Sequence, residues 1–226
     1  MNTALIGILI VIALSTYLVG SIPTAYLVGR VNGIDIFSVG SGNMGATNIS
    51  RTLGFRWGAL VLIVDLLKGV AGVLIGRMLG GTYFVLGAFT GGLAVIIGHN
   101  WSLFATLITR KIRGGKGAAT SAGAWIALVA AWWWLIAGPA LMFFAMISLT
   151  RYVSLSVLVT GAVAALGGAV AGLQGILPKP YALFGVIMLL LLFYRHRENI
   201  QRLLAGTERR VGNQEKPLES SGTAHS

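Results

Sequence analysis

Long runs of apolar residues, separated by short polar segments, dominate the sequence. The runs cover residues 4–27, 57–79, 83–98, 118–137, 139–150, 153–174 and 181–194. The longer runs reach the roughly 20 residues that an α-helix needs to cross a bilayer. We therefore predict an all-α, polytopic membrane bundle of about seven transmembrane helices, some of them short. The fifth run is short and begins at Pro139, which leaves a buried or partly inserted helix as the alternative.

The composition agrees with a membrane protein. Hydrophobic residues make up 56% of the chain and charged residues only 10%, and the mean hydropathy is +0.83, whereas soluble domains carry about 25% charged residues. The first run has no basic segment before it and continues into Gly20–Pro23, which argues against a cleaved signal peptide. We expect one integral membrane domain over residues 1–208 and a disordered cytoplasmic tail over residues 209–226.

The absence of cysteine and the placement of the acidic residues limit the chemistry that this chain can perform. The sequence has no cysteine, which excludes disulfides, thiolate metal ligands and a cysteine nucleophile. The six acidic residues form no cluster with histidine at ligand spacing, so we predict no metal site and no cofactor. The net charge of +11 raises the question of nucleic acid, but most cations lie beside apolar runs, where topology and anionic lipid explain them.

The lysines and arginines indicate the orientation of the helices. With the N-terminus outside and the C-terminus in the cytoplasm, all but three of the 17 Lys and Arg residues fall in cytoplasmic segments. Arg77 and Lys179 then lie outside, and Lys68 lies within a span. Cytoplasmic loops are enriched in these residues, so we predict this topology. Trp132–Trp134 then fall near the outer surface, where an aromatic belt is a simpler explanation than a ligand-stacking site.

Two polar segments on the predicted cytoplasmic side have the composition of anion sites. The first, residues 38–54, is rich in Ser, Asn, Thr and Gly and contains Arg51. Its donors suit a phosphate, although an ordinary hydrophilic loop has a similar composition. The second, residues 98–117, ends in the sequence Gly-Gly-Lys-Gly with three cations just before it. Glycines allow backbone N–H groups to converge on an anion, and the lysine adds a point charge.

The second segment is not a nucleotide-binding P-loop. Lys116 is followed by Gly117 rather than Ser or Thr, and position 110 is an arginine rather than a glycine. A phosphate cradle at the edge of a membrane instead indicates chemistry on a phosphorylated lipid precursor.

A third polar segment, residues 194–210, follows the last apolar run. His196 and Asn199 are spaced i, i+3 and therefore share one face of a helix. Arg195 and Arg197 point elsewhere, and we expect them to contact lipid headgroups.

Three further polar residues lie in or beside apolar runs. Asp65 and Lys68 are spaced i, i+3 inside the second run, where ionisable residues are costly and face a cavity or each other. A mutual pair that braces the bundle is the simpler interpretation, and direct contact with substrate is the alternative. His99, where the third run ends, is likewise more simply structural than catalytic. His225 is assigned no role.

Six stretches along the chain carry a family resemblance: GSIPTAYLVGR (20–30), SGNMGATNISR (41–51), DLLKG (65–69), GHNWSLF (98–104), RGGKGAAT (113–120) and HRENIQRLLAGTE (196–208). Together they resemble the bacterial membrane acyl-phosphate:glycerol-3-phosphate acyltransferases, over about residues 17–208. The resemblance implies a seven-helix enzyme of phospholipid synthesis. It would transfer a fatty acyl group from acyl phosphate to the 1-hydroxyl of glycerol 3-phosphate, giving lysophosphatidic acid and phosphate.

The resemblance also implies roles for the motif residues. It implies catalytic roles for Ser41, Arg51, His196 and Asn199, and a structural role for Glu208. It links glycerol 3-phosphate to Arg51, Gly114, Gly115, Lys116 and Gly117. In the glycine-rich first segment, we interpret as the acyl-phosphate cradle the residues Gly42, Asn43, Gly45, Thr47 and Asn48. Asp65 and Lys68 keep their structural interpretation.

The chemistry fits a chain without cysteine. Acyl phosphate has a good leaving group, so the substrate hydroxyl can attack it without a covalent enzyme intermediate. Either His196 or the leaving phosphate accepts the hydroxyl proton. Other glycerolipid acyltransferases commonly use a His-x4-Asp pair, but here Phe104 follows His99 by five positions and Gln201 follows His196 by five.

A transporter or flippase for an anionic solute is the alternative function, since an intramembrane charge pair in a multi-span chain fits one. The clustering of the polar motifs on one face argues for the enzyme. We expect a multi-pass protein of the bacterial cytoplasmic (inner) membrane, with its active site on the cytoplasmic face. Its partners are the two substrates and the bilayer, with no obligatory protein partner and no nucleic acid.

Overall fold

The computed structural model describes residues 3–212 of the chain. Within these residues the chain is all-helical and contains no strand, which confirms the prediction of an all-α fold. The seven longer helices are α1 (Thr3–Ser21), α4 (Phe55–Gly80), α5 (Phe84–Asn100), α7 (Ala118–Leu128), α8 (Trp134–Thr150), α9 (Val153–Leu173) and α10 (Lys179–Arg195). The short ones are α2 (Thr24–Val31), α3 (Ala46–Leu53), α6 (Leu103–Thr109) and α11 (Arg197–Leu204), with a 3-10 turn over Gly81–Tyr83.

Each predicted run overlaps one of the longer helices, but the boundaries near residues 21–27 and 128–139 were wrong. The first run was extended to residue 27, whereas α1 ends at Ser21 and α2 starts after Pro23, whose ring and missing N–H do not continue a helix. The run over residues 118–137 is interrupted, since α7 ends at Leu128 and α8 starts at Trp134. The intervening turn is as apolar as its flanks, so hydropathy gives no sign of it.

Three helical stretches are long and apolar enough to cross a membrane by length and composition, namely Thr3–Val31, Phe55–Thr109 and Val153–Leu173. The helices α7 and α8 are shorter apolar helices. Large apolar side chains such as Leu14, Leu141 and Leu166 are exposed on the outside of the bundle. Exposed apolar surface of this extent suits contact with lipid rather than water.

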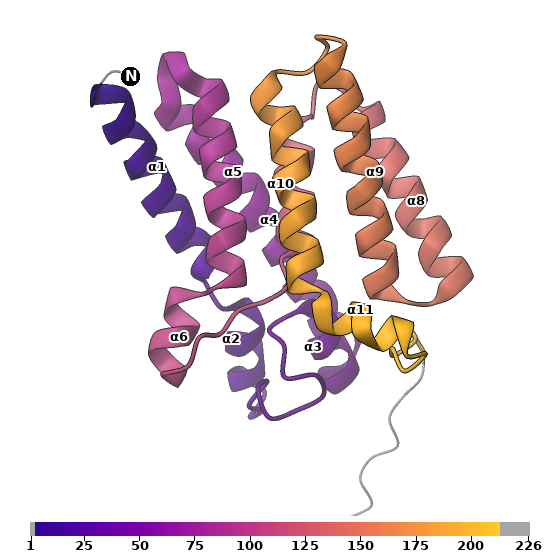
Figure 1. The fold of residues 1–226 in the computed structure, drawn as a ribbon. Coiled ribbons are helices and arrows are strands. Elements are labelled where there is room, and N and C mark those ends of the chain that lie inside the picture. The colour runs from indigo at the N-terminus through magenta and orange to yellow at the C-terminus, as the bar shows by residue number, and fades with distance from the viewer. Residues whose placement is uncertain (1–2, 213–226) are drawn as a thin grey trace, which may run out of the picture.

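The helix α4 lies at the centre of the N-terminal half and packs against α1, α5 and α7, while α8, α9 and α10 pack side by side (Figure 1). Glycines allow the closest of these contacts. A Cβ added to Gly76 of α4 would collide with the carbonyl oxygen of Gly87 on α5, so the two backbones touch. Small residues serve this purpose in membrane bundles, where close packing replaces the hydrophobic effect.

The short helices α2, α3, α6 and α11 gather at one end of the bundle, opposite the N-terminus (Figure 1). The three polar segments identified in the sequence therefore meet at this polar end. The chain remains ordered just past residue 208, because Val211 donates its N–H to the Arg151 carbonyl oxygen at 2.8 Å and Arg210 Nε donates to the Tyr152 hydroxyl at 3.0 Å. Residues 209–212 of the expected disordered tail thus lie against the start of α9, and the remainder of that tail lies outside the described residues.

Candidate active site

A cavity of about 530 Å³ opens at the polar end and continues between α7, α8 and α9. Its mouth is lined by residues from all three polar segments, and its inner arm by apolar residues that include Trp125, Ile136, Phe143, Val157 and Met188. The predicted site residues in the wall are Ser41, Asn43, Gly45, Thr47, Asn48, Arg51, Asp65, Lys116, Gly117, His196, Asn199 and Glu208. Gly42, Lys68, Gly114 and Gly115 are not part of the wall.

Asn48 organises the loop that carries Ser41. Its Oδ1 accepts the N–H of Ser41 at 2.9 Å, and its Nδ2 donates to the carbonyl oxygens of Val39 and Asn43, both at 3.2 Å. Gly40 and Gly42 have φ angles of +57° and +65°, which glycine tolerates best. Because the buried Asn48 amide is engaged within the loop, it shapes the predicted phosphate cradle from behind. The Ser41 side chain, by contrast, is exposed at the cavity wall.

Two helix N-termini open on the cavity. The helix α3 starts after Gly45, and α7 starts after Gly117, whose φ of +76° turns the chain into the helix. The first residues of both helices line the cavity. The N–H groups of a first helical turn have no partner within the helix and carry partial positive charge. Both helices therefore direct donors toward an anion in the cavity.

Gly114 and Gly115 have a packing role that the sequence did not predict. Gly115 donates its N–H to the carbonyl oxygen of His99 at 3.0 Å, so this donor is not free for an anion. A Cβ on Gly115 would collide with His99 Nε2, and one on Gly114 with the carbonyl oxygen of Asn100. Neither residue has a positive φ. These two glycines are needed because the loop lies directly on the end of α5.

Arg195 holds the same turn from the opposite side. Its Nε and Nη2 donate to the carbonyl oxygen of Gly115 at 3.1 and 2.7 Å, and its guanidinium lies over the ring of Trp101. The expectation that Arg195 faces lipid headgroups was therefore wrong. Helical spacing placed Arg195 on a different helix face from His196 and Asn199. The turn that contains Gly114 and Gly115 lies against that face.

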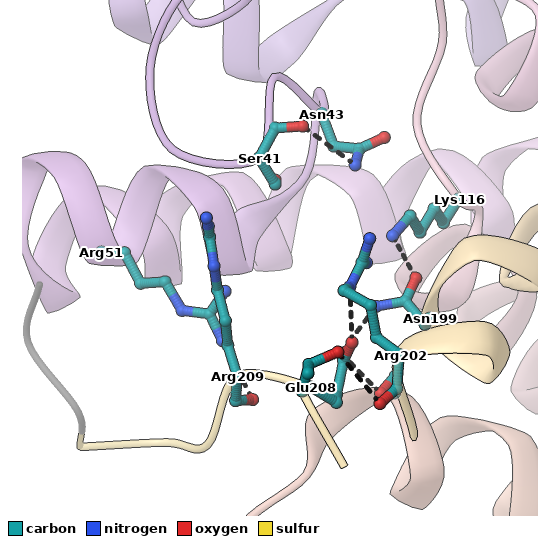
Figure 2. A network of polar contacts seen from close by, with 10 residues as sticks. Ser41, Asn43, Arg51, Lys116, Asn199, Arg202, Glu208 and Arg209 are labelled. Atoms are coloured by element: carbon teal, nitrogen blue, oxygen red, sulfur yellow. Dashed lines mark hydrogen bonds and ion pairs between the residues drawn. The ribbon is translucent and has the colours of Figure 1, made fainter. Parts of the chain in front are cut away.

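Lys116, which follows this turn, joins the second and third segments (Figure 2). Its Nζ donates to Asn199 Oδ1, and Asn199 Nδ2 donates to Glu208 Oε1 at 2.7 Å. Glu208 also accepts from Ser154 Oγ at 2.9 Å and from Arg202 Nε at 2.9 Å. Glu208 thereby fixes the orientation of the Asn199 amide, so that the Oδ1 of Asn199 points toward Lys116.

Burial shifts the pKa values of Lys116, His196 and Glu208. Desolvation, followed by the nearby Arg202, lowers the pKa of Lys116 to about 8. Desolvation also lowers the pKa of His196 to about 4, so its ring is neutral at pH 7. His196 Nδ1 lies 2.8 Å from the carbonyl oxygen of Leu192 and donates to it, which leaves Nε2 as an acceptor. Burial acts to raise the pKa of Glu208, but hydrogen bonds from Asn199, Arg202 and Ser154 together lower it.

Sequence reasoning missed several residues of the cavity wall. Arg202 and Arg209 were treated only as cytoplasmic cations, yet both line the mouth, and Arg51 Nη2 lies 3.5 Å from the carbonyl oxygen of Arg209 (Figure 2). Arg202 follows Asn199 by three positions, so helical spacing could have placed it on the same face. Ser121, in the first turns of α7, is a buried wall residue whose hydroxyl has no hydrogen-bond partner in the described structure.

Asp65 and Lys68 form an ion pair of 2.7 Å inside the bundle. Lys68 Nζ also donates to the carbonyl oxygen of Ile22 at 2.6 Å, and Thr24 Oγ1 donates to Asp65 Oδ1 at 3.0 Å. His99 Nδ1 lies 3.8 Å from the same carboxylate oxygen. Over residues 3–212, no group of three or more His, Asp and Glu side chains is placed to hold a metal ion.

The chain is similar to known glycerol-3-phosphate acyltransferases in sequence and in fold. The family profile of glycerol-3-phosphate acyltransferase matches residues 10–206. Glycerol-3-phosphate acyltransferase 2 of Moorella thermoacetica is 46% identical over 198 residues, covering 87% of this chain and 94% of the relative. The corresponding enzyme of Rubrobacter xylanophilus is 40% identical over 210 residues, covering 90% and 95%.

Two crystal structures of PlsY (YgiH), an integral membrane glycerol 3-phosphate acyltransferase, have the same fold. The glycerol 3-phosphate form superposes with a TM-score of 0.78 at 32% identity, covering 90% of this chain and 96% of that one. The lysophosphatidic acid form gives a TM-score of 0.76 at the same identity, covering 90% and 95%.

Proposed function

Because the chain belongs to the glycerol-3-phosphate acyltransferase family and is such an enzyme, we propose that it takes the acyl group from acyl phosphate and transfers it to the 1-hydroxyl of glycerol 3-phosphate. The observation that carries this proposal is the cavity itself. One end combines lysine, arginines and two helix N-termini, and the other is an apolar arm between helices. Such a site suits two phosphates and one acyl chain. Family membership decides against the transporter alternative.

Each substrate has a proposed place in the cavity. The phosphate of glycerol 3-phosphate binds at Lys116, the N-terminus of α7 and Arg51. The phosphate of the donor binds at the N-terminus of α3, beside Ser41 and Thr47. The acyl chain lies in the apolar arm, where Trp125 and Phe143 line the wall. This arrangement brings the acyl carbonyl and the glycerol hydroxyl together at the junction of the two ends.

The reaction then needs no covalent enzyme intermediate. The glycerol hydroxyl oxygen attacks the acyl carbonyl carbon, the bond from that carbon to the phosphate oxygen breaks, and the ester forms. The hydroxyl proton passes to the leaving phosphate, which departs as inorganic phosphate. With a pKa of about 4, His196 is a weaker base than a phosphate, whose second pKa is about 6. We assign His196 Nε2 to accept a hydrogen bond from the 2-hydroxyl of glycerol 3-phosphate, which orients the acceptor while the 1-hydroxyl keeps its proton for the leaving phosphate.

We also infer that the polar end faces the cytoplasm of a bacterial inner membrane. Most of the lysines and arginines gather at this end, and the positive-inside rule then places the N-terminus outside. Glycerol 3-phosphate would reach the cavity mouth from the cytosol, while the acyl chain stays within the thickness of the bilayer.

The test is a stoichiometry assay on the purified protein in detergent. Acyl phosphate and radiolabelled glycerol 3-phosphate are mixed, and lysophosphatidic acid and inorganic phosphate are both followed. We expect one phosphate for each lysophosphatidic acid, and no phosphate release above background without glycerol 3-phosphate. Rapid release of phosphate in the absence of the acceptor would contradict direct transfer, because it requires an acyl-enzyme or water as the acceptor.

A further inference from the structure

A buried polar cluster lies directly beneath the turn that contains Gly114 and Gly115, called the glycine turn below. It consists of Asp65 and Lys68 on α4, Thr24 at the start of α2, and His99 near the end of α5. Asp65, Lys68 and His99 are only 3%, 5% and 7% exposed. One oxygen of Asp65 accepts from Lys68 and from Thr24 and lies 3.8 Å from His99 Nδ1. Three elements distant in sequence therefore converge on a single carboxylate oxygen.

A bracing role alone does not account for this cluster. Buried ion pairs contribute little net stability, because the desolvation of both charges offsets their attraction. Lys68 already joins α4 to the chain before α2 through the carbonyl oxygen of Ile22. Asp65 and His99, in contrast to Lys68, both line the active-site cavity. The cluster therefore forms part of the wall of the active-site cavity.

His99 supports the glycine turn through two contacts. Its carbonyl oxygen accepts the N–H of Gly115, and its Nε2 occupies the space that a Cβ on Gly115 would need. The next residue is Lys116, whose ammonium reaches into the cavity and donates to Asn199. With Arg195 on the other side of the turn, the backbone before Lys116 is held between α5 and α10.

We propose that Asp65 and His99 are positioning residues for the acceptor site. Asp65 orients the imidazole of His99, His99 fixes Gly115, and the turn places Lys116 for the phosphate of glycerol 3-phosphate. The inference deepens the proposed function, since it rests on the assignment of Lys116 to that phosphate. It gives the intramembrane charge pair a purpose that the bracing interpretation lacks.

The main experiment separates positioning from bracing. The variant D65L/K68M replaces both buried charges with apolar side chains, which commonly leaves stability unchanged or raises it. The matched variant D65N/K68M is equally uncharged but keeps an oxygen that His99 can face. Thermal unfolding in detergent and steady-state KM values for both substrates are measured for each. D35N, at an exposed carboxylate outside the cavity wall, serves as the control.

Positioning predicts a specific kinetic pattern. In D65L/K68M, unfolding stays close to wild type while the KM for glycerol 3-phosphate rises by up to about 100-fold, as expected when a binding group moves by about 1 Å. The KM for acyl phosphate changes little, and D65N/K68M lies between this variant and wild type. Wild-type KM values in a well-folded D65L/K68M would overturn the proposal.

A second pair of variants covers the case in which D65L/K68M does not fold. G115A introduces the Cβ that collides with His99, and H99A removes the ring that occupies this space. We expect H99A/G115A to unfold at a higher temperature than G115A, with strongly non-additive effects, as contacting residues show. Additive destabilisation would mean that His99 does not shape the turn.

Binding of glycerol 3-phosphate, measured as its stabilisation of the protein against heat, separates this inference from the proposed donor. If wild type binds glycerol 3-phosphate but does not use acyl phosphate, the donor assignment fails while the positioning test remains valid. If D65L/K68M binds glycerol 3-phosphate as tightly as wild type, the positioning role fails whatever the donor.

Discussion

Lys116 donates a hydrogen bond to the side-chain oxygen of Asn199, across 83 positions of sequence. The contact ties the glycine turn to α11, and Glu208 holds the Asn199 amide in the orientation that makes it possible. Lys116 forms no ion pair with any carboxylate among residues 3–212. Its charge is therefore available to a substrate phosphate, which is the role that we propose for it.

The first prediction concerns the pH dependence of acceptor use. Lys116 is charged below its pKa of about 8 and loses its charge as the pH rises through this value. Glycerol 3-phosphate becomes a dianion as the pH rises through about 6. We expect kcat/KM for glycerol 3-phosphate to be greatest between these values. His196, with a pKa of about 4, adds no titration step within this window.

Two variants test whether the loss of charge on Lys116 causes the fall in kcat/KM at alkaline pH. In K116R the side chain stays charged at all working pH values, so the fall above about pH 8 should move to higher pH. In K116A, loss of a charge-assisted contact should cost about 1.5–3 kcal/mol, or roughly tenfold to hundredfold in kcat/KM. An unchanged alkaline limb in K116R would show that another group titrates there.

The second prediction concerns the apolar arm. Pro139 lies inside α8 and has no N–H for the carbonyl oxygen of Leu135, four residues earlier. Trp125 supplies the missing donor, since its Nε1 donates to that oxygen at 2.9 Å. W125F should therefore destabilise the protein by about 1–3 kcal/mol, because it leaves a buried carbonyl unpaired. The measurement is thermal unfolding of the purified protein in detergent.

A compensating change makes this prediction specific. In W125F/P139A, the new N–H at position 139 can bond to Leu135 within the helix, so much of the lost stability should return. W133F is the matched control, because Trp133 is 71% exposed and its substitution should change stability by less than about 0.5 kcal/mol. Equal destabilisation in W125F and W125F/P139A would contradict this account of the helix.

Hydropathy and motif spacing predicted much of this molecule. The seven apolar runs each overlap one of the longer helices, and Ser41, Lys116 and His196, which lie far apart in sequence, all line one cavity. These features depend on local composition and on helical periodicity, which a sequence records directly. The turn over residues 129–133 was missed because apolar residues fill it as they fill the helices around it.

The role of the glycine turn was harder to foresee. Gly115 was interpreted as a donor to phosphate, whereas its N–H is taken by His99 and its missing Cβ leaves room for the imidazole. Arg195 was assigned to lipid, whereas it holds the turn from the other side. These contacts join separate helices, and no periodicity along one segment of the chain encodes them.

The third prediction concerns orientation, and the absence of cysteine makes it direct to test. T82C lies in the turn between α4 and α5, and K111C lies between α6 and α7; both positions are exposed. If the polar end faces the cytoplasm, a membrane-impermeant maleimide added to intact cells should label T82C and not K111C. Opening the cells should make both reactive. Labelling of K111C from outside would reverse the topology.

The identity of the acyl donor tests the central claim most directly. Purified protein receives glycerol 3-phosphate together with acyl phosphate, acyl-CoA or acyl-carrier protein, each at the same concentration, and lysophosphatidic acid is measured. A cavity whose polar mouth is formed by short loops accommodates a small phosphate, and the described chain has no separate domain for the adenine and pantetheine of coenzyme A. We predict turnover with acyl phosphate and little or none with the other two donors. Comparable rates with acyl-CoA would contradict this account.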